Sequence, residues 1–216
     1  MGGEGRKSRE DRLKLEKSGT WVSSSTDFTI LLKRLYRHSK NYSKSVDGNC
    51  SPYVLCAIPM LFSALRCLMI EYESFYPPDR AVLKVLTEPN DFSKMLDHYK
   101  VTGQLLQEAN LLNEIRNEIV HPAHLPTGTS DNWPEYLQEI KQMGLLQSTG
   151  KVEVDYDFFA QMSSHKLFSW ACRVAQDIAA CIVQSNSQKS KTKVRFTVNF
   201  QEINNENDLC MSIIEF

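Results

Sequence analysis

Apolar residues recur every three or four positions over most of this chain, which is the spacing of α-helices that bury one side. Long runs with this spacing predict helices at 28–42, 53–76, 104–120 and 158–185. Shorter runs predict helical pieces at 79–86, 91–99 and 134–143. The order of these elements predicts an all-α fold, a helical bundle.

Near the C-terminus the apolar spacing changes from helical to alternating. Residues 194–200 alternate, 204–208 are rich in turn formers, and 209–216 are apolar again. This pattern predicts a small β-hairpin appended to the bundle. Residues 1–20 are charged and nearly free of large apolar side chains, which is typical of a mobile tail. We therefore expect a tail at 1–20, a helical domain at 21–188 and a β appendage at 189–216.

The first predicted helix has one apolar side and one basic side. Thr26 or Asp27 is expected to cap it. Its apolar side is predicted to comprise Phe28, Leu31, Leu32, Leu35, Tyr36 and Tyr42. Its basic side carries Lys33, Arg34, Arg37, His38, Lys40 and Lys44, with no acidic residue between Asp27 and Asp47. Of these, Lys33, Arg34, Arg37 and Lys40 are the candidates for RNA binding. Two interpretations remain open, a solvated helix face and an RNA-binding strip that contacts phosphates.

The run at 53–76 is apolar enough to raise the question of a membrane span. Pro59, Arg66, Glu71 and Glu73 interrupt it, and fewer than about 18 apolar residues run without a break. We therefore expect a buried core helix and no membrane association. Pro77 and Pro78 end this run.

A cluster of polar residues lies at the end of the helix predicted at 104–120. Its buried stripe is predicted to comprise Leu105, Ala109, Leu112, Ile115 and Ile119. Asn113, Asn117 and His121 are four residues apart, so each lies about 40° round the helix from the last. Arg116 flanks this polar line, and Pro122 ends the helix because proline disfavours helical geometry in the preceding residue. The cluster is the strongest candidate for a functional site.

Composition and charge constrain the class of protein only broadly. Of the 216 residues, 42% are hydrophobic and 24% are charged, which is ordinary for a globular domain. The net charge of −1 means that any basic surface must be local. Six cysteines occur without a Cys-x-x-Cys pair, and the start of the chain lacks the pattern of a signal peptide. We expect free thiols and a cytoplasmic location.

The sequence Arg-Asn-Glu-Ile-Val-His at 116–121 resembles the Arg-Asn-x-x-x-His motif of the HEPN superfamily. The order of predicted helices from about residue 28 to 186 resembles that family as well. Many HEPN proteins are metal-independent ribonucleases that act as toxins or as antiviral-defence effectors. The resemblance implies an HEPN-like bundle and assigns catalysis to Arg116, Asn117 and His121. In one toxin subgroup a Tyr follows the His by two residues, but this chain has Ala123 there. Regulation through such a Tyr is therefore not implied.

The chemistry of these side chains fits that reaction. Cleavage of RNA without a metal uses the ribose 2′-OH as nucleophile, a base, an acid and a cation at the phosphoryl centre. His can transfer protons near neutral pH, and Arg binds phosphate oxygens in pairs. Asn117 can orient the imidazole or the phosphate. One chain supplies a single motif His, so we expect a two-fold homodimer, which the resemblance also implies. The expected partners are RNA and an antitoxin or regulatory protein, with no cofactor.

Several alternatives remain open at the sequence level. Arg116 could pair with Glu114 or Glu118, and His121 could merely cap the last carbonyls of the helix. His121 and His124 could hold a metal, but no further ligand lies close by in sequence, and zinc takes three or four. A non-catalytic HEPN module that binds nucleotide, RNA or a partner protein is the main competing function. A helical interaction protein without such a ligand is the other.

Overall fold

The computed structural model describes residues 24–45, 53–75, 92–122, 133–146, 161–187, 195–199 and 210–215. Most of this part is helical, which confirms the predicted all-α character. The helices are α2 (Ser24–Ser45), α3 (Tyr53–Phe75), α5 (Phe92–His98), α6 (Gly103–Val120), α7 (Glu135–Gln142) and α9 (His165–Ser187). The predicted tail at 1–20 and the predicted helix at 79–86 lie outside the described residues.

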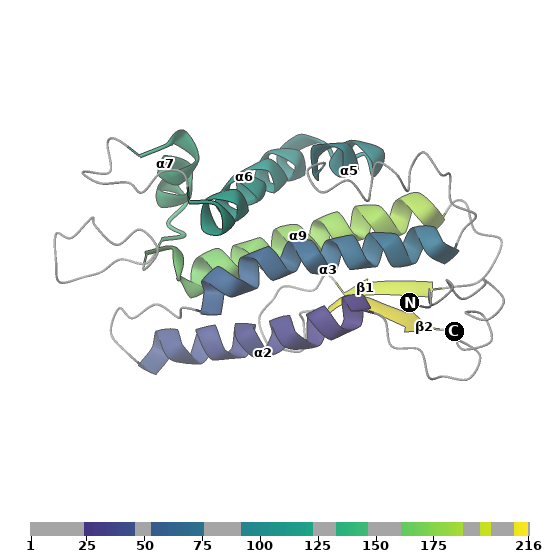
Figure 1. Cartoon of the computed structure of the whole chain (residues 1–216), viewed down its shortest axis with the longest axis horizontal. Coiled ribbons are helices and arrows are strands. Elements are labelled where there is room, and N and C mark those ends of the chain that lie inside the picture. Colours follow the sequence, from purple (N-terminus) through teal and green to yellow (C-terminus); the bar gives the residue numbers. More distant parts are fainter. Residues whose placement is uncertain are drawn as a thin grey trace, which may run out of the picture.

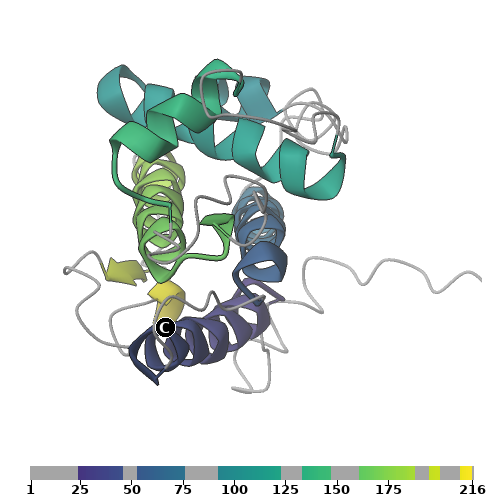
Figure 2. The same ribbon diagram turned by 90° about the vertical axis from the view of Figure 1, so that its left-hand side faces the viewer.

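The helices form three layers. α3 and α9 lie side by side in the middle, α2 lies on one side of them, and α5, α6 and α7 lie on the other (Figures 1 and 2). α3 packs against α2 and α9, and α6 packs against α9, α3 and α7. The two outer layers therefore face solvent in opposite directions.

Helix α3 is the apolar centre of the bundle, as its composition predicts. By length and composition alone, Tyr53–Ile70 would be able to cross a membrane, and 44% of that stretch is buried inside the fold. The buried side chains recur at helical spacing and face α2, α6 and α9. They are Val54, Ala57, Ile58, Leu61, Ala64, Leu65, Leu68 and Met69.

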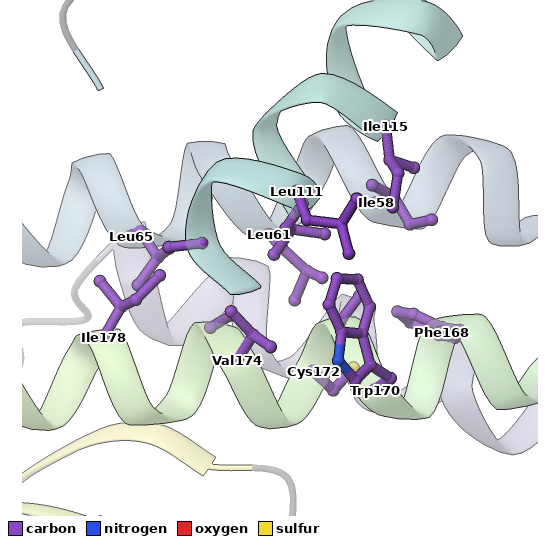
Figure 3. Close-up of a cluster of buried hydrophobic side chains, with 14 of the residues drawn as sticks. Ile58, Leu61, Leu65, Leu111, Ile115, Phe168, Trp170, Cys172, Val174 and Ile178 are labelled. Atoms are coloured by element: carbon purple, nitrogen blue, oxygen red, sulfur yellow. The ribbon is translucent and has the colours of Figure 1, made fainter. Parts of the chain in front are cut away.

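The core lies where α3, α6 and α9 meet. Trp170 of α9 points toward Leu111 of α6, and Leu61 of α3 lies beside them (Figure 3). Phe168 and Ile115 are fully buried in the same cluster. Fully burying one such side chain stabilises the fold by about 1.5–3 kcal/mol, so this cluster fixes the position of α6 on the bundle.

The start and the apolar side of α2 differ from the predictions. The helix begins at Ser24, so Thr26 and Asp27 lie within its first turn and are not its caps. Leu31 was expected on the buried side but is 41% exposed. The reason is that α3 and α9 cover the arc centred on Leu32 and Tyr36, and Leu31 lies about 100° from Leu32.

The helix predicted at 158–185 is interrupted, which is a second difference. Residues 161–162 are helical, the chain turns at Ser163 and Ser164, and α9 begins at His165. The hydroxyl of Ser164 accepts a hydrogen bond from the backbone N–H of Leu167 at 3.0 Å. That bond caps the new helix, because it satisfies an N–H group that has no partner within the first turn.

Two short strands follow the helices, β1 (Arg195–Asn199) and β2 (Cys210–Glu215), and they pair antiparallel. Arg195 lies opposite Glu215, and the register shifts between Thr197 and Asn199. Residues 200–209 lie outside the described part, so a hairpin connection between the strands stays a prediction. The strands contact α2 and α9.

Candidate active site at the end of helix α6

The motif helix ends where the sequence predicts. α6 starts at Gly103, whose φ of 64° favours glycine, and its last helical residue is Val120. His121 leaves helical geometry with φ −133° and ψ 69°, and its backbone N–H donates to the Asn117 carbonyl at 2.7 Å. Pro122 follows directly, so the structure agrees with a proline-terminated helix.

Arg116 lies closer to the buried side of α6 than the sequence suggests. It follows Leu112 by four residues and is therefore only about 40° from that fully buried side chain. Its guanidinium carbon lies 5.8 Å from the centre of the Phe62 ring on α3. Its Nε is buried and has no hydrogen-bond partner in the part of the chain that the structure describes. The arginine is half-buried, and Phe62 holds its charged end from one side.

Asn117 contacts one of the other two predicted catalytic residues through its side chain. Its side-chain oxygen accepts a hydrogen bond from Arg116 Nη1 at 2.8 Å. Its backbone oxygen accepts from the His121 N–H, which is the ordinary main-chain bond of the last helical turn. His121 is exposed and lies five positions after Arg116, which corresponds to about 140° round the helix. The structure therefore brings the Arg116 and Asn117 side chains together and leaves the His121 side chain on a different side of the helix end.

The two structural alternatives for these side chains do not fit the contacts. Within the described residues Arg116 forms no ion pair, either with Glu114 or with Glu118. No hydrogen bond of the His121 imidazole to the last carbonyls of α6 is present among the same residues. The one local partner of Arg116 in the described residues is thus the neutral Asn117, which leaves its charge unbalanced.

Glu118 instead belongs to a buried contact that the sequence did not indicate. It is only 5% exposed, and its Oε2 accepts a hydrogen bond from the Tyr136 hydroxyl of α7 at 2.8 Å. Burial and the neighbouring carboxylates of Glu118 and Glu114 raise the pKa of Tyr136 well above its ordinary value. One signal was present, since Glu118 follows the buried Leu111 by seven residues and shares its face. The contact fixes α7 against the end of α6.

The predicted RNA-binding residues lie far from this helix end. Lys33, Arg34, Arg37 and Lys40 are on α2, where Arg34 and Arg37 are exposed and the two lysines are half-buried. α2 and α6 lie on opposite sides of the layer formed by α3 and α9 (Figures 1 and 2). Within one chain the fold therefore does not bring the basic side of α2 to the predicted catalytic residues.

A second polar cluster lies between α2 and α9, and it is better explained as structural. Ser39 Oγ lies 2.8 Å from His165 Nδ1, and Ser169 Oγ lies 3.3 Å from His165 Nε2. A Ser–His pair at such a distance can activate a nucleophile. However, Ser39 is 1% exposed, and its hydroxyl also donates to the Tyr36 carbonyl at 2.9 Å. A substrate cannot reach this serine, so the cluster joins two helices.

The alternative of a metal held by His121 and His124 is not resolved by the structure, because His124 lies outside the described residues. Among the residues that are described, no three His, Cys, Asp or Glu side chains gather in a way that could hold a metal ion. Among the described residues Cys56, Cys172 and Cys181 are free thiols. Burial raises the pKa of Cys172 well above its ordinary value, so this thiol is not a reactive nucleophile.

Comparison of the chain with protein-family models, with curated proteins and with solved structures finds no match. The assignment of a function therefore depends on the motif residues and on their contacts.

Proposed function

We propose that this protein is a metal-independent endoribonuclease of HEPN type. The observation that carries the proposal is the end of α6 itself, where Arg116 bonds to Asn117 without an acidic partner in the described residues and is followed by an exposed His121. An imidazole that solvent can reach is able to exchange a proton with a substrate. An arginine with no acidic partner in the described residues keeps its positive charge for an anion.

The proposed reaction is a transesterification at phosphorus. The 2′-oxygen of the ribose bonds to phosphorus and gives its proton to a base, while the 5′-oxygen leaves and takes a proton from an acid. The products carry a 2′,3′-cyclic phosphate and a 5′-hydroxyl. Arg116 would stabilise the negative charge that gathers on the phosphoryl oxygens. His121 would transfer one of the two protons.

The second proton-transfer group would come from a second copy. A two-fold axis near the end of α6 would bring two copies of His121 to opposite sides of one phosphate. The proposed interface is formed by the ends of α6 and α9. The proposed fold is an HEPN-like bundle, and residues 194–216 form its hairpin. The same proposal includes a role as a toxin or defence effector and a cytoplasmic location. It also includes control by an antitoxin or regulatory protein.

The test is incubation of the full chain with labelled single-stranded RNA in EDTA. We expect cleavage that leaves 2′,3′-cyclic phosphate ends, and no cleavage when deoxyribose replaces the ribose at the cut. His121→Ala should abolish it. His98→Ala is the matched control, because His98 also ends a helix and packs edge-on against Tyr99. A strict requirement for Mg²⁺ or Mn²⁺, or full activity of folded His121→Ala, would contradict the proposal.

One observation favours a second candidate, a non-catalytic HEPN module that binds RNA, nucleotide or a partner protein. Phe62 covers part of the Arg116 guanidinium, and Asn117 occupies one of its nitrogens. An arginine held in this way can bind a phosphate without taking part in bond cleavage. The same assay separates the candidates, since binding of labelled RNA that stays intact supports only the second one.

A further inference from the structure

The two outer layers of the bundle each contain a patch whose exposed charges have a single sign. On α2 the buried arc comprises Thr29, Leu32, Tyr36 and Ser39, while Ile30 and Arg34 lie on the opposite, exposed side. We call Ile30, Leu31, Lys33 and Arg34 the α2 face. It contains two cations and no anion. Helices α3 and α9 and strand β2 contact α2, and the exposed Ile30 and Arg34 lie on the side of the helix opposite to its buried arc.

The opposite layer exposes acids. On α7 the buried side chains are Leu137 and Ile140, and Glu135 and Glu139 lie on the exposed side, one helical turn apart. Glu114 of α6 is exposed and close enough for its charge to act on Tyr136 of α7. The one cation of α7, Lys141, lies 5.3 Å from the Trp133 ring centre, away from Glu135 and Glu139. We call Glu114, Glu135, Glu139 and Met143 the α7 face.

Exposed apolar side chains accompany both sets of charges. In the described part of the chain, the large hydrophobic residues that are exposed include Ile30 at 47% and Leu31 at 41% on the α2 face, and Met143 at 41% on the α7 face. Tyr53 lies beside α2, because its ring packs edge-on against His38, and Val120 ends α6 next to α7. Each face thus combines apolar surface with charges of a single sign, which is the composition of a binding surface.

We propose that the α2 face of one copy binds the α7 face of another copy. The charges are complementary, with Lys33 and Arg34 against Glu135, Glu139 and Glu114, and the exposed apolar residues would be covered together. The two faces lie on opposite sides of one molecule, so the contact is head-to-tail and leaves a free face at each end of a pair. Copies would therefore add in succession into an open chain or a closed ring.

The net charge of the chain fits such an assembly. A strongly charged protein repels its own copies, whereas this chain carries a net charge of only −1, so overall repulsion between copies is weak. The inference does not depend on ribonuclease activity. It is also distinct from the two-fold dimer of the proposed enzyme, because a two-fold contact uses the same face on both copies and does not extend.

The test is sedimentation velocity of the full chain over a range of concentrations and salt. The wild-type chain should form species larger than a dimer as concentration rises. Raising the ionic strength from about 0.1 to 1 M shortens the screening length from about 10 to 3 Å, so these species should dissociate. Arg34→Glu and Glu139→Arg each place like charges opposite one another, and each should weaken association at least about tenfold. Circular dichroism verifies that each variant is folded.

A charge swap makes the test specific. The double variant Arg34→Glu/Glu139→Arg restores opposite charges across the contact and should recover association. Arg66→Glu on α3 and Asp97→Arg on α5 are the matched controls, since they reverse an exposed charge elsewhere and should leave association unchanged. A monomer at every concentration, a dimer that does not extend, or a double variant that fails to recover overturns the proposal. If Arg34→Glu abolishes RNA binding and leaves sedimentation unchanged, the α2 face binds RNA and the proposal is wrong.

Discussion

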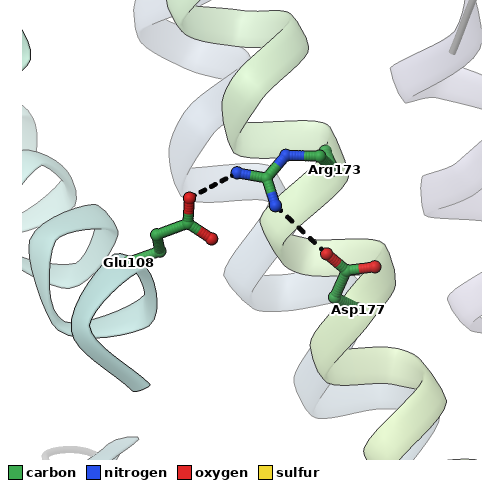
Figure 4. Close-up of polar contacts among 3 residues, drawn as sticks. All are labelled: Glu108, Arg173 and Asp177. Atoms are coloured by element: carbon green, nitrogen blue, oxygen red, sulfur yellow. Dashed lines mark hydrogen bonds and ion pairs between the residues drawn. The ribbon is translucent and has the colours of Figure 1, made fainter. Parts of the chain in front are cut away.

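The two halves of helix α6 each carry an acid that contacts another helix, but the partner of the acid differs in charge. In the first half, Glu108 forms an ion pair with Arg173 of α9 at 2.6 Å, and Arg173 also pairs with Asp177 at 3.2 Å (Figure 4). In the last turns, Glu118 accepts a hydrogen bond from the neutral phenol of Tyr136. Arg116 lies two residues from Glu118 and nevertheless bonds to Asn117.

Arg173 thus joins two helices through an ion pair, whereas the charge of Arg116 is not balanced by an acid in the described residues. The pKa of Arg173 is raised, first by its hydrogen bond to Glu108, so its proton is held within the ion pair. In the described residues Arg116 has no such counter-charge, and its Nε has been removed from water without a partner. A desolvated cation without a counter-ion gains more from binding an anion than an exposed one does. This comparison supports our proposal that Arg116, rather than Arg173, binds the phosphate.

The largest expected effect comes from removing each arginine in turn. If Arg116 stabilises the phosphoryl centre, Arg116→Ala should lower kcat for RNA cleavage by about 10²–10³-fold, as loss of one stabilising donor does. Arg173→Ala should keep kcat, because its guanidinium is occupied by Glu108 and Asp177. Single-turnover cleavage by the two folded variants measures the difference. Equal losses in both would show that Arg116 acts only through the fold.

The next effect concerns stability at the end of α6. Glu118→Ala leaves the part-buried Tyr136 hydroxyl without the carboxylate that accepts its hydrogen bond. An unsatisfied buried polar group costs about 1–3 kcal/mol, so we expect urea unfolding to shift by an amount in that range. Glu114→Ala on the same helix is exposed and serves as the control. Equal stability of the two variants would mean that the Tyr136 contact does not hold α7 in place.

A smaller effect is expected in the first half of the helix. The Arg173 side chain is 45% exposed, so solvent screens its two ion pairs. Arg173→Ala should lower the free energy of unfolding by about 0.5–1 kcal/mol, the upper part of the range for surface pairs. The double variant Glu108→Ala/Arg173→Ala completes a thermodynamic cycle that isolates the interhelical pair. A coupling energy of zero would show that this pair does not join α6 to α9.

Local signals in the sequence were sufficient for most helices and for the end of α6. The apolar spacing that defines α3 and the proline that ends α6 are signals that act within a few residues. The helix α3 and the end of α6 were therefore predicted correctly. The burial of Glu118 depends on Tyr136, 18 residues away in a different helix. Periodicity in one helix cannot reveal such a partner. The half-buried position of Arg116 likewise depends on Phe62 of α3.

The wrong start predicted for the last long helix has a local cause. Ser163 and Ser164 interrupt the predicted helix because the Ser164 hydroxyl caps α9, although an unbroken apolar stripe continues across Leu167 and Trp170. Here a local capping bond determined the helix boundary, although the longer apolar pattern predicted an unbroken helix.

For the site, the sequence placed Arg116, Asn117 and His121 at one helix end. It could not show that the basic side of α2 lies across the molecule, because that depends on how the layers stack.

The smallest expected effect is the dependence of the free energy of unfolding on pH through Tyr136. Tyr136 has its pKa raised above 10, first by burial and then by the Glu118 carboxylate, whereas in the unfolded chain it ionises near 10. Its contribution to stability is therefore complete below pH 10 and is lost as pH rises toward the folded pKa. Tyr136 is partly solvent-exposed, so the loss should be only a fraction of the maximum of about 1.4 kcal/mol per pH unit. Urea unfolding between pH 9 and 11 measures it.

Two variants at this contact test the cause of that pH dependence. Tyr136→Phe should make the unfolding free energy less dependent on pH than in the wild-type chain, because one late-ionising phenol is gone. Glu118→Gln keeps the phenol and removes the nearest negative charge, so the pKa of Tyr136 should fall part of the way back toward 10. Phenolate absorbance reports that change directly. An unchanged titration in Glu118→Gln would show that the Glu118 carboxylate does not contribute to the raised pKa of Tyr136.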